Sequence, residues 1–449
     1  MRVLFTPWPT PAHLYPIVPL AWALQTAGHE VRIATHASIA GAIASSGLAA
    51  VPLGDPEHTP LGPGVPWQPE IEQKMERITE ALGLEYPDRD HWDVLYKFML
   101  PSMWDWFPYG ASPSDPHREL DELVEFARYW QPDLVIWDPV CPIGAVAAKV
   151  TGAAHGRHLW GIDYFAWAMD RFAERAERPG QQPEENPLVE TMRPACERYG
   201  VELDDELITG QFTIDPLPAA MRLPTATRTV PMRWEPYSAQ TPLAPWLLRA
   251  PSRPRVGMSL GLSQRLFFAD GWDQVPRLME MVADLDIEVV ATLDANQLSQ
   301  VAALPDNVRT VDFVALNQLL PTCSVLIHQG GMGTFAAAAA LGVPQLILDH
   351  DVENGWTVVE TEDGEEGLAT EKHTESTATA TYVTERGAGL PLDIRQAVDV
   401  MRKNLVRLLE ERSFRDGAAE VRADTLSAPT PNEVVSVLER LTTQHRSRT

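Results

Sequence analysis

Residues 325–348 constrain the fold of this chain more than any other stretch. They begin with a short apolar run typical of a buried strand and continue into a turn with glycines at positions 330, 331 and 333. A run of good helix formers follows, and Gly342 and Pro344 end it before a second apolar run. The pattern predicts strand, glycine turn, helix and strand, which is an α/β arrangement with parallel strands.

The glycine turn has the features of an anion site. Backbone N–H groups at the start of a helix lack partners, and together with the helix dipole they attract a phosphate. Glycine permits positive φ and close approach of the backbone to a ligand. We expect Gly330, Gly331, Gly333 and Thr334 to surround a phosphate, and His328 to bond it through one ring nitrogen. On the glycines alone, a simple packing turn is an equal alternative.

The charge and the cysteines narrow the class of protein. The 449 residues carry a formal charge of −26, which argues against nucleic acid as a partner. It also means that any phosphate site has to be locally positive. The three cysteines lie far apart, so we expect neither a disulfide framework nor a zinc site. The first residues read as a strand rather than a signal peptide, and no 18-residue apolar run occurs, which predicts a cytoplasmic protein without a membrane span.

The order of the predicted elements indicates two domains. Strands and helices alternate in both halves, which predicts two Rossmann-like domains with parallel sheets covered on both faces. The first loop lacks a G-x-G-x-x-G run, so the N-terminal domain has no obvious grip on a nucleotide. We place the N-terminal domain at 1–225 with a helical insert at about 55–115, a proline-rich linker at 226–252, the C-terminal domain at 253–430, and a helix and tail at 431–449. The Thr- and Glu-rich residues 361–382 read as a solvated loop or a disordered insert.

The run HQGGMGT, followed by a helix and GVPQ, resembles the donor-binding motif of inverting nucleotide-sugar-dependent glycosyltransferases. These enzymes have two facing Rossmann-like domains, the GT-B fold. Their pattern is His-x-Gly-Gly-x-Gly-Thr, and every fixed position is present. The resemblance covers the chain apart from the Thr/Glu segment, and blocks such as PDLVIWDP and TIDPLPAAMR narrow it to the macrolide and anthracycline group that includes erythromycin-type desosaminyltransferases.

This resemblance implies the chemistry of both substrates. The donor is expected to be a thymidine-diphosphate (TDP) deoxysugar, transferred with inversion and without a metal or another cofactor. The acceptor is expected to be an apolar polyketide, either a macrolactone or an aromatic aglycone. The aromatic-rich residues 67–106 resemble the subgroup that needs a P450-like auxiliary protein without haem. A homodimer is compatible with the resemblance, and the sequence does not name the oligomer.

The resemblance also assigns the catalytic residues. His13 corresponds to the usual base, and the ordinary pKa of histidine, about 6.5, suits that role. Asp138 ends a predicted strand and is expected to orient His13, with Asp163 as the runner-up. From position alone, His13 is better explained as a packed loop residue than as a base. Asp138 is equally well explained as a helix cap and as the residue that orients a base.

The remaining candidates are residues expected to contact either the donor or the acceptor. For the donor they are Ser259, Gly261 and Ser263 in a facing loop, Phe313 and Val314 near the nucleobase, and Glu353 and Asn354. The last two stand where the family has Asp-Gln to hold sugar hydroxyls, and Asp349 or Asp351 are alternatives there. A core position is the more frequent role for a residue such as Phe313. For the acceptor the candidates are Trp67, Trp92, Trp104 and Trp160.

Two other functions stay open from the sequence. A catalytically silent nucleotide-sugar-binding or auxiliary protein would keep the glycine turn but would not need His13. A nucleotide-sugar epimerase of related fold would need acid and base groups facing the sugar and no aromatic acceptor pocket. Product analysis separates all three, because they give a glycoside, an isomeric donor, or nothing.

Overall fold

The computed structural model describes most of the chain, namely residues 1–57, 69–108, 110–178, 186–239, 241–267, 274–350, 352, 357–360, 366–370 and 372–446. It separates into two compact units. Unit 1 is Met1–Leu217 with Arg222–Met232 and Pro429–Thr449, and unit 2 is Pro218–Met221 with Arg233–Ala428. Most of the stretch expected as a linker therefore clusters with unit 2, and the C-terminal segment belongs to unit 1.

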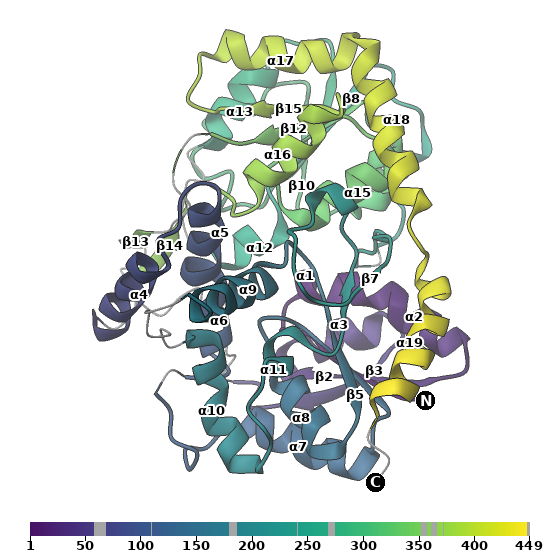
Figure 1. Cartoon of the computed structure of the whole chain (residues 1–449). Coiled ribbons are helices and arrows are strands. Elements are labelled where there is room, and N and C mark those ends of the chain that lie inside the picture. Colours follow the sequence, from purple (N-terminus) through teal and green to yellow (C-terminus); the bar gives the residue numbers. More distant parts are fainter. Residues whose placement is uncertain are drawn as a thin grey trace. The chain divides into compact units, whose positions relative to one another are not determined.

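Unit 1 is built on a seven-stranded sheet in the order β3-β2-β1-β4-β5-β6-β7 (Figure 1). Every neighbouring pair is parallel. The strands are β1 (Arg2–Thr6), β2 (Glu30–His36), β3 (Ala49–Leu53), β4 (Leu134–Trp137), β5 (Ala154–His158), β6 (Thr213–Asp215) and β7 (Thr229–Pro231). The helices between and around them are α1 (Pro11–Leu14), α2 (Val18–Thr26), α3 (Ala40–Ser45), α7 (Arg118–Trp130), α8 (Ile143–Thr151), α9 (Tyr164–Ala176), α10 (Pro187–Tyr199) and α11 (Glu206–Thr209).

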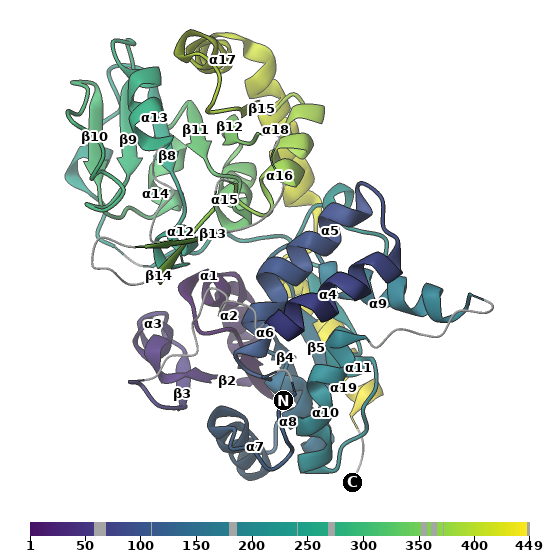
Figure 2. The ribbon, with the colours of Figure 1, turned by 90° about the vertical axis from the view of Figure 1, so that its left-hand side faces the viewer.

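Between β3 and α7 the chain leaves the regular alternation. This segment contains α4 (Pro69–Leu82), α5 (Asp88–Val94) and α6 (Leu100–Trp104), with a π-helical turn at Leu95–Met99. Helices α4 and α5 lie against α9, as Figure 2 shows. The segment thus packs as a small helical layer of its own rather than as part of the sheet.

Unit 2 carries a six-stranded parallel sheet in the order β10-β9-β8-β11-β12-β15. Its strands are β8 (Arg255–Ser259), β9 (Glu288–Thr292), β10 (Val308–Val311), β11 (Val325–His328), β12 (Gln345–Leu348) and β15 (Gly389–Leu392). Its helices are α12 (Leu262–Phe267), α13 (Gln274–Val282), α14 (Leu316–Leu319), α15 (Met332–Leu341), α16 (Ser376–Glu385), α17 (Val398–Glu410) and α18 (Arg412–Ser427). A separate antiparallel hairpin is formed by β13 (Thr357–Glu360) and β14 (Glu366–Ala369).

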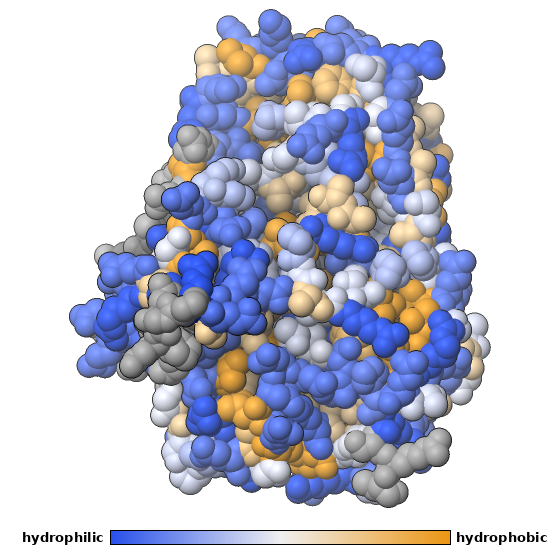
Figure 3. All heavy atoms as spheres, viewed as in Figure 1, coloured by the Kyte–Doolittle hydropathy of each residue, from blue (hydrophilic) through white to orange (hydrophobic). Residues whose placement is uncertain are grey.

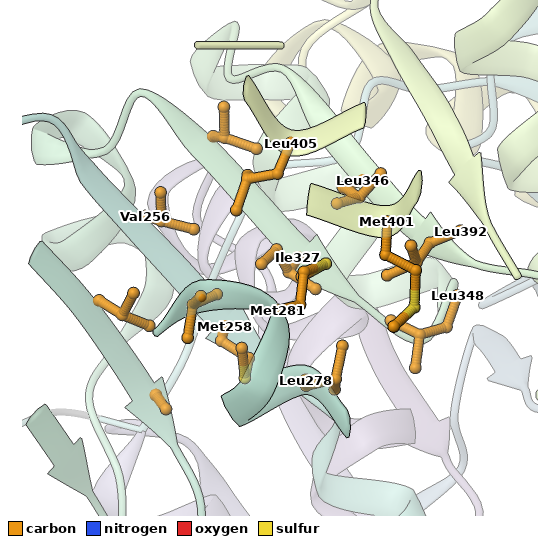
Figure 4. Packing of buried hydrophobic residues seen from close by; sticks show 14 of the residues in the cluster. Val256, Met258, Leu278, Met281, Ile327, Leu346, Leu348, Leu392, Met401 and Leu405 are labelled. Carbon is orange, nitrogen blue, oxygen red and sulfur yellow. The ribbon is translucent and has the colours of Figure 1, made fainter. Parts of the chain in front are cut away.

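The core of unit 2 explains why residues 325–348 form strand, helix and strand. Val325 and Ile327 pack with α13 and α17 on one face of the sheet, and the cluster around Ile327 is shown in Figure 4. Leu326 points to the other face, where it packs against the alanines of α15. Both faces are therefore buried, and each large apolar side chain contributes about 1.5–3 kcal/mol to that burial.

The Thr/Glu-rich segment is not simply a loop, and that expectation was wrong for its described part. Residues 366–369 form β14, and Ser376–Glu385 form α16. The helix buries Thr379, Ala380 and Val383 and packs against β12 and β15. Threonine is a weak helix former, so tertiary burial rather than local propensity fixes this helix.

The last helix, α19 (Pro431–His445), joins unit 1. It starts at a capping box between Thr430 and Glu433, with Pro431 at its first position. It packs against α2, and Oε1 of Glu439 lies 3.0 Å from Nε2 of His29. The terminal helix expected at 431–449 is therefore part of the first unit's structure.

The face drawn in Figure 3 is mainly hydrophilic, with apolar areas between the hydrophilic ones. In the part of the chain that the structure describes, no helix has both the length and the apolar character needed to cross a bilayer.

Candidate active site

A buried histidine–aspartate pair forms the centre of the site in unit 1. Strands β1 and β4 are neighbours, with Thr6 opposite Trp137, so the loops after them leave from the same edge of the sheet. The first loop carries His13 in the short helix α1, and the second begins with Asp138. Nδ1 of His13 lies 2.7 Å from Oδ2 of Asp138, and both side chains are buried.

The carboxylate of Asp138 is held by further donors. Its Oδ1 accepts bonds from the backbone N–H of Val140 at 3.0 Å and from Nε1 of Trp160 at 3.2 Å. Since a carboxylate only accepts, the proton of the His13 bond lies on Nδ1, and Nε2 keeps its lone pair. An imidazole oriented in this way can take a proton from a hydroxyl group. Asp138 does not cap α8, because that helix begins after Pro142.

Two indole rings flank the imidazole of His13. The ring of Trp160 lies 4.4 Å from it, and the ring of Trp8 lies 4.9 Å away in an edge-on arrangement. Trp160 was predicted to bind the acceptor, and the structure places it in direct contact with His13 and Asp138. Trp8 was not predicted at all; the only signal was its place in the proline-rich loop that carries His13.

Two of the other tryptophans expected at the acceptor pack against unit 1 helices. Trp92 is fully buried and donates to Thr79 Oγ1 at 2.7 Å, so it packs inside the helical layer and offers no ring face to a ligand. Trp104 is half-buried and bonds Thr191 Oγ1 at 3.0 Å. Trp67 lies outside the described residues.

Asp163, the runner-up to Asp138, has another partner. Its two carboxylate oxygens accept bonds of 2.8 and 2.6 Å from the buried guanidinium of Arg157. Oδ1 also accepts from the N–H of Ala166 and caps α9. This bidentate pair brackets the loop that presents Trp160, so Asp163 supports the site without contacting His13.

The glycine turn of unit 2 is built as the sequence predicts. Gly330 has φ of +92°, and Gly331 is the N-cap of α15. No side chain caps this helix. Thr334 lies in its first turn and is buried, and a Cβ on Gly333 would meet only the edge of Trp234, at 3.9 Å. Around Gly333 the start of α15 is thus lined by backbone, which suits an anion.

His328 has a different role from the one expected. It is fully buried, its Nδ1 accepts from the N–H of Gly330 at 3.1 Å, and its Nε2 donates to Oε1 of Gln345 at 2.9 Å. Burial lowers its pKa to about 4, so the ring is neutral at physiological pH. Both nitrogens are occupied, and the ring therefore holds the turn rather than offering a bond to a phosphate.

The loop after β8 lies beside this turn because β8 and β11 are neighbouring strands. Ser259 is buried, Ser263 is partly buried, and Gly261 has φ of +83°. The amide of Gln329 occupies the space that a side chain at Gly261 would need. Ser259, paired with His328, and Gly261, in contact with Gln329, are thus placed next to the glycine turn.

The remaining donor candidates differ in their exposure to solvent. Phe313 is 39% exposed, which leaves its ring available for stacking, whereas Val314 is buried in a small apolar cluster with Leu319. Val314 is thus a core residue in this structure. Glu353, Asn354 and Asp351 lie outside the described residues.

The start of α16 contributes residues that the sequence did not reveal. Oγ1 of Thr379 lies 3.1 Å from the carbonyl oxygen of Gly330, one of three carbonyl oxygens within reach of its single hydroxyl proton. Asp349 accepts bonds from Ser376 at 3.0 Å and Thr377 at 2.9 Å, and Lys372 lies 3.3 Å away. The Thr/Glu-rich composition predicted a loop here, and the local sequence contains no signal for a helix that packs against the glycine turn.

Two parallel-sheet domains, a glycine turn at the start of a helix in the second and a buried histidine–aspartate pair in the first define a glycosyltransferase with the GT-B fold. The chain belongs to the family of erythromycin biosynthesis protein CIII-like proteins. The model of that family's N-terminal domain matches residues 22–261, and the model of its C-terminal domain matches residues 276–378 and 364–441.

Relatives of known name resemble the chain over its full length. It is 39% identical to the aclacinomycin-T 2-deoxy-L-fucose transferase of Streptomyces galilaeus, covering 99% of this chain and 97% of that protein. It is 38% identical to the 10-deoxymethynolide desosaminyltransferase of Streptomyces venezuelae, covering 99% and 98%. Among solved structures, the spinosyn forosaminyltransferase SpnP has a TM-score of 0.76 at 35% identity, covering 99% of each chain. The glycosyltransferase VinC in complex with DTDP also has 0.76, at 34% identity, covering 99% of this chain and 100% of that one.

Proposed function

We propose that this enzyme transfers a deoxysugar, with inversion, from a TDP-deoxysugar to a hydroxyl group of a polyketide-type aglycone. The observation that carries the proposal is the bond between His13 and Asp138, which leaves one ring nitrogen of a buried histidine as a base. The relatives support the substrate classes, because their names join deoxysugars with macrolide and anthracycline aglycones. The DTDP complex of VinC supports the donor nucleotide.

The proposed reaction needs one base and one stabilised leaving group. Nε2 of His13 accepts the proton of the acceptor hydroxyl, and Asp138 stabilises the imidazolium that forms. The hydroxyl oxygen bonds to the anomeric carbon while the bond from that carbon to the diphosphate breaks. The diphosphate keeps the electron pair, and the start of α15 stabilises its charge. The proposal requires no metal.

The setting of the reaction is part of the same proposal. The acceptor is a macrolactone or an aromatic polyketide, and the enzyme works in the cytoplasm. A P450-like auxiliary protein without haem activates it, and the functional unit is a homodimer. Size measurement in solution, alone and with such an auxiliary protein, tests these last two points.

The test of function is direct product analysis. The purified enzyme is incubated with TDP-deoxysugars and with macrolactone or anthracyclinone acceptors, with and without an auxiliary protein. A glycoside of inverted configuration, absent with His13→Ala, is the expected product. An isomerised donor would indicate an epimerase, and no product with any pair would indicate a silent binding protein. Calorimetric titration with TDP, UDP and NAD shows beforehand whether the donor nucleotide binds.

A further inference from the structure

His373 lies beside the N-terminus of α15, the helix that follows the glycine turn, although no sequence motif includes His373. The residue comes shortly before α16 in the Thr/Glu-rich segment. Its Nε2 atom is 3.1 Å from the position that a Cβ on Gly331 would take, and its Cε1 atom is 3.5 Å from it. Gly331 is the N-cap of α15. The edge of the imidazole therefore shares the side-chain space at the N-terminus of that helix with the amide nitrogen of Gln329, which lies 2.9 Å from the same position.

The hydrogen bonds of His373 determine which nitrogen carries the proton. Its Nδ1 accepts from the backbone N–H of Glu375 at 3.3 Å. Desolvation lowers its pKa to about 4, so the ring is neutral at physiological pH. A neutral imidazole with an accepting Nδ1 has its proton on Nε2. Within the described residues, no acceptor is bonded to that N–H.

The surroundings favour an anion as the missing acceptor. Helix α15 has ten residues, and no side chain caps its start. The nearby carboxylate of Asp349 is balanced by Lys372 and by the hydroxyls of Ser376 and Thr377, so its charge is largely compensated. A helix N-terminus and a neutral N–H donor at the same place form a site for a phosphate oxygen.

We propose that His373 is a donor-binding residue, whose Nε2–H bonds the diphosphate of the nucleotide sugar at the start of α15 and stabilises it as it leaves. This inference rests on the proposed function, which places a TDP-sugar at the same turn. It gives His373 the contact that the sequence predicted for His328. His328 cannot supply it in this geometry, because its two nitrogens bond Gly330 and Gln345.

Two substitutions at one position separate a hydrogen bond from a packing role. His373→Leu fills a similar volume and removes the donor, whereas the amide nitrogen of His373→Gln can replace Nε2–H. Calorimetric titration with TDP and with thymidine then reports the diphosphate and nucleoside contacts separately. We expect His373→Leu to weaken TDP binding about tenfold or more, with thymidine binding unchanged, and His373→Gln to keep most of the TDP affinity. His445→Leu, in α19 of the other unit, is the matched control and should bind TDP normally.

The outcomes are distinct. The proposal is overturned if His373→Leu binds TDP as tightly as the natural protein, or if it loses TDP and thymidine affinity equally. Equal losses in the Leu and Gln variants would also overturn it, because the donor would then be irrelevant. If the natural protein binds thymidine but not TDP, or neither, the proposed function itself fails before the variants are compared. Thermal unfolding of each variant shows whether the fold is intact.

Discussion

Nδ1 of His13 and Oδ2 of Asp138 lie 2.7 Å apart, although 125 positions separate the two residues in the chain. Strands β1 and β4 are adjacent and parallel, so the segments that follow them meet at the same edge of the sheet. The bond selects one tautomer of His13, and both side chains are buried. The arrangement that the proposed reaction requires is therefore a consequence of strand order.

Removing the base should separate chemistry from binding. We expect His13→Ala to lower kcat by about 10²–10⁴-fold, because general-base catalysis contributes that much. TDP affinity should stay unchanged, since the glycine turn lies in the other compact unit. Single-turnover kinetics with calorimetry on the same preparation make the comparison. A parallel fall of TDP affinity and rate would contradict the assignment of His13 as the base.

Trp160 is expected to position the histidine–aspartate pair. Trp160→Phe keeps an aromatic ring beside His13 and removes the N–H bonded to Asp138. Loss of that bond leaves the carboxylate less firmly held against His13, so kcat should fall about tenfold while TDP affinity stays unchanged. Trp22→Phe, which removes an N–H bonded to the Ser46 carbonyl, is the control. An unchanged kcat in Trp160→Phe would leave Trp160 with a packing role only.

Gly330 and Gly28 make a matched pair for the packing of the glycine turn. Both have positive φ, at +92° and +86°, so alanine is strained at either position. A Cβ on Gly330 would lie 2.5 Å from Cα of Ser376, whereas nothing lies within 4 Å of one on Gly28.

We therefore expect Gly28→Ala to cost about 1–2 kcal/mol of unfolding free energy and Gly330→Ala to cost about 1–3 kcal/mol more. Urea unfolding measures both values. Equal costs would show that α16 is not packed on the turn in solution.

His328 predicts an acid sensitivity of unit 2. Its pKa is about 4 in the fold and about 6.5 in the unfolded chain, so the unfolded state binds the proton first as pH falls. The neutral ring thus contributes stability that is complete above pH 6.5 and lost progressively down to pH 4. His328→Gln cannot titrate, and its unfolding free energy should fall less between pH 7 and pH 5. His373, whose pKa is also about 4, should still contribute part of the pH dependence of the unfolding free energy in that variant. The same pH slope in both proteins would contradict the account.

The local pattern of the sequence was sufficient to predict some features. Residues 325–348 form strand, glycine turn, helix and strand because the apolar runs, the glycines and the alanines act over a few positions. For His13 the resemblance decided the assignment, because its position alone favoured a packed loop residue, and Asp138 was then chosen for its place at the end of a predicted strand. The GT-B fold followed from the alternation of strands and helices in both halves and from the same motif.

Tertiary structure decided which side chains meet. The sequence could not show that Gln345 and Gly330 occupy both nitrogens of His328, that α16 folds back on the turn, or that α19 packs on unit 1. It also could not place His373 beside Gly331 or Trp160 beside His13. Short-range propensity fixes an element, whereas burial and hydrogen bonding between distant segments fix its neighbours, and the chemistry of this protein depends on those neighbours.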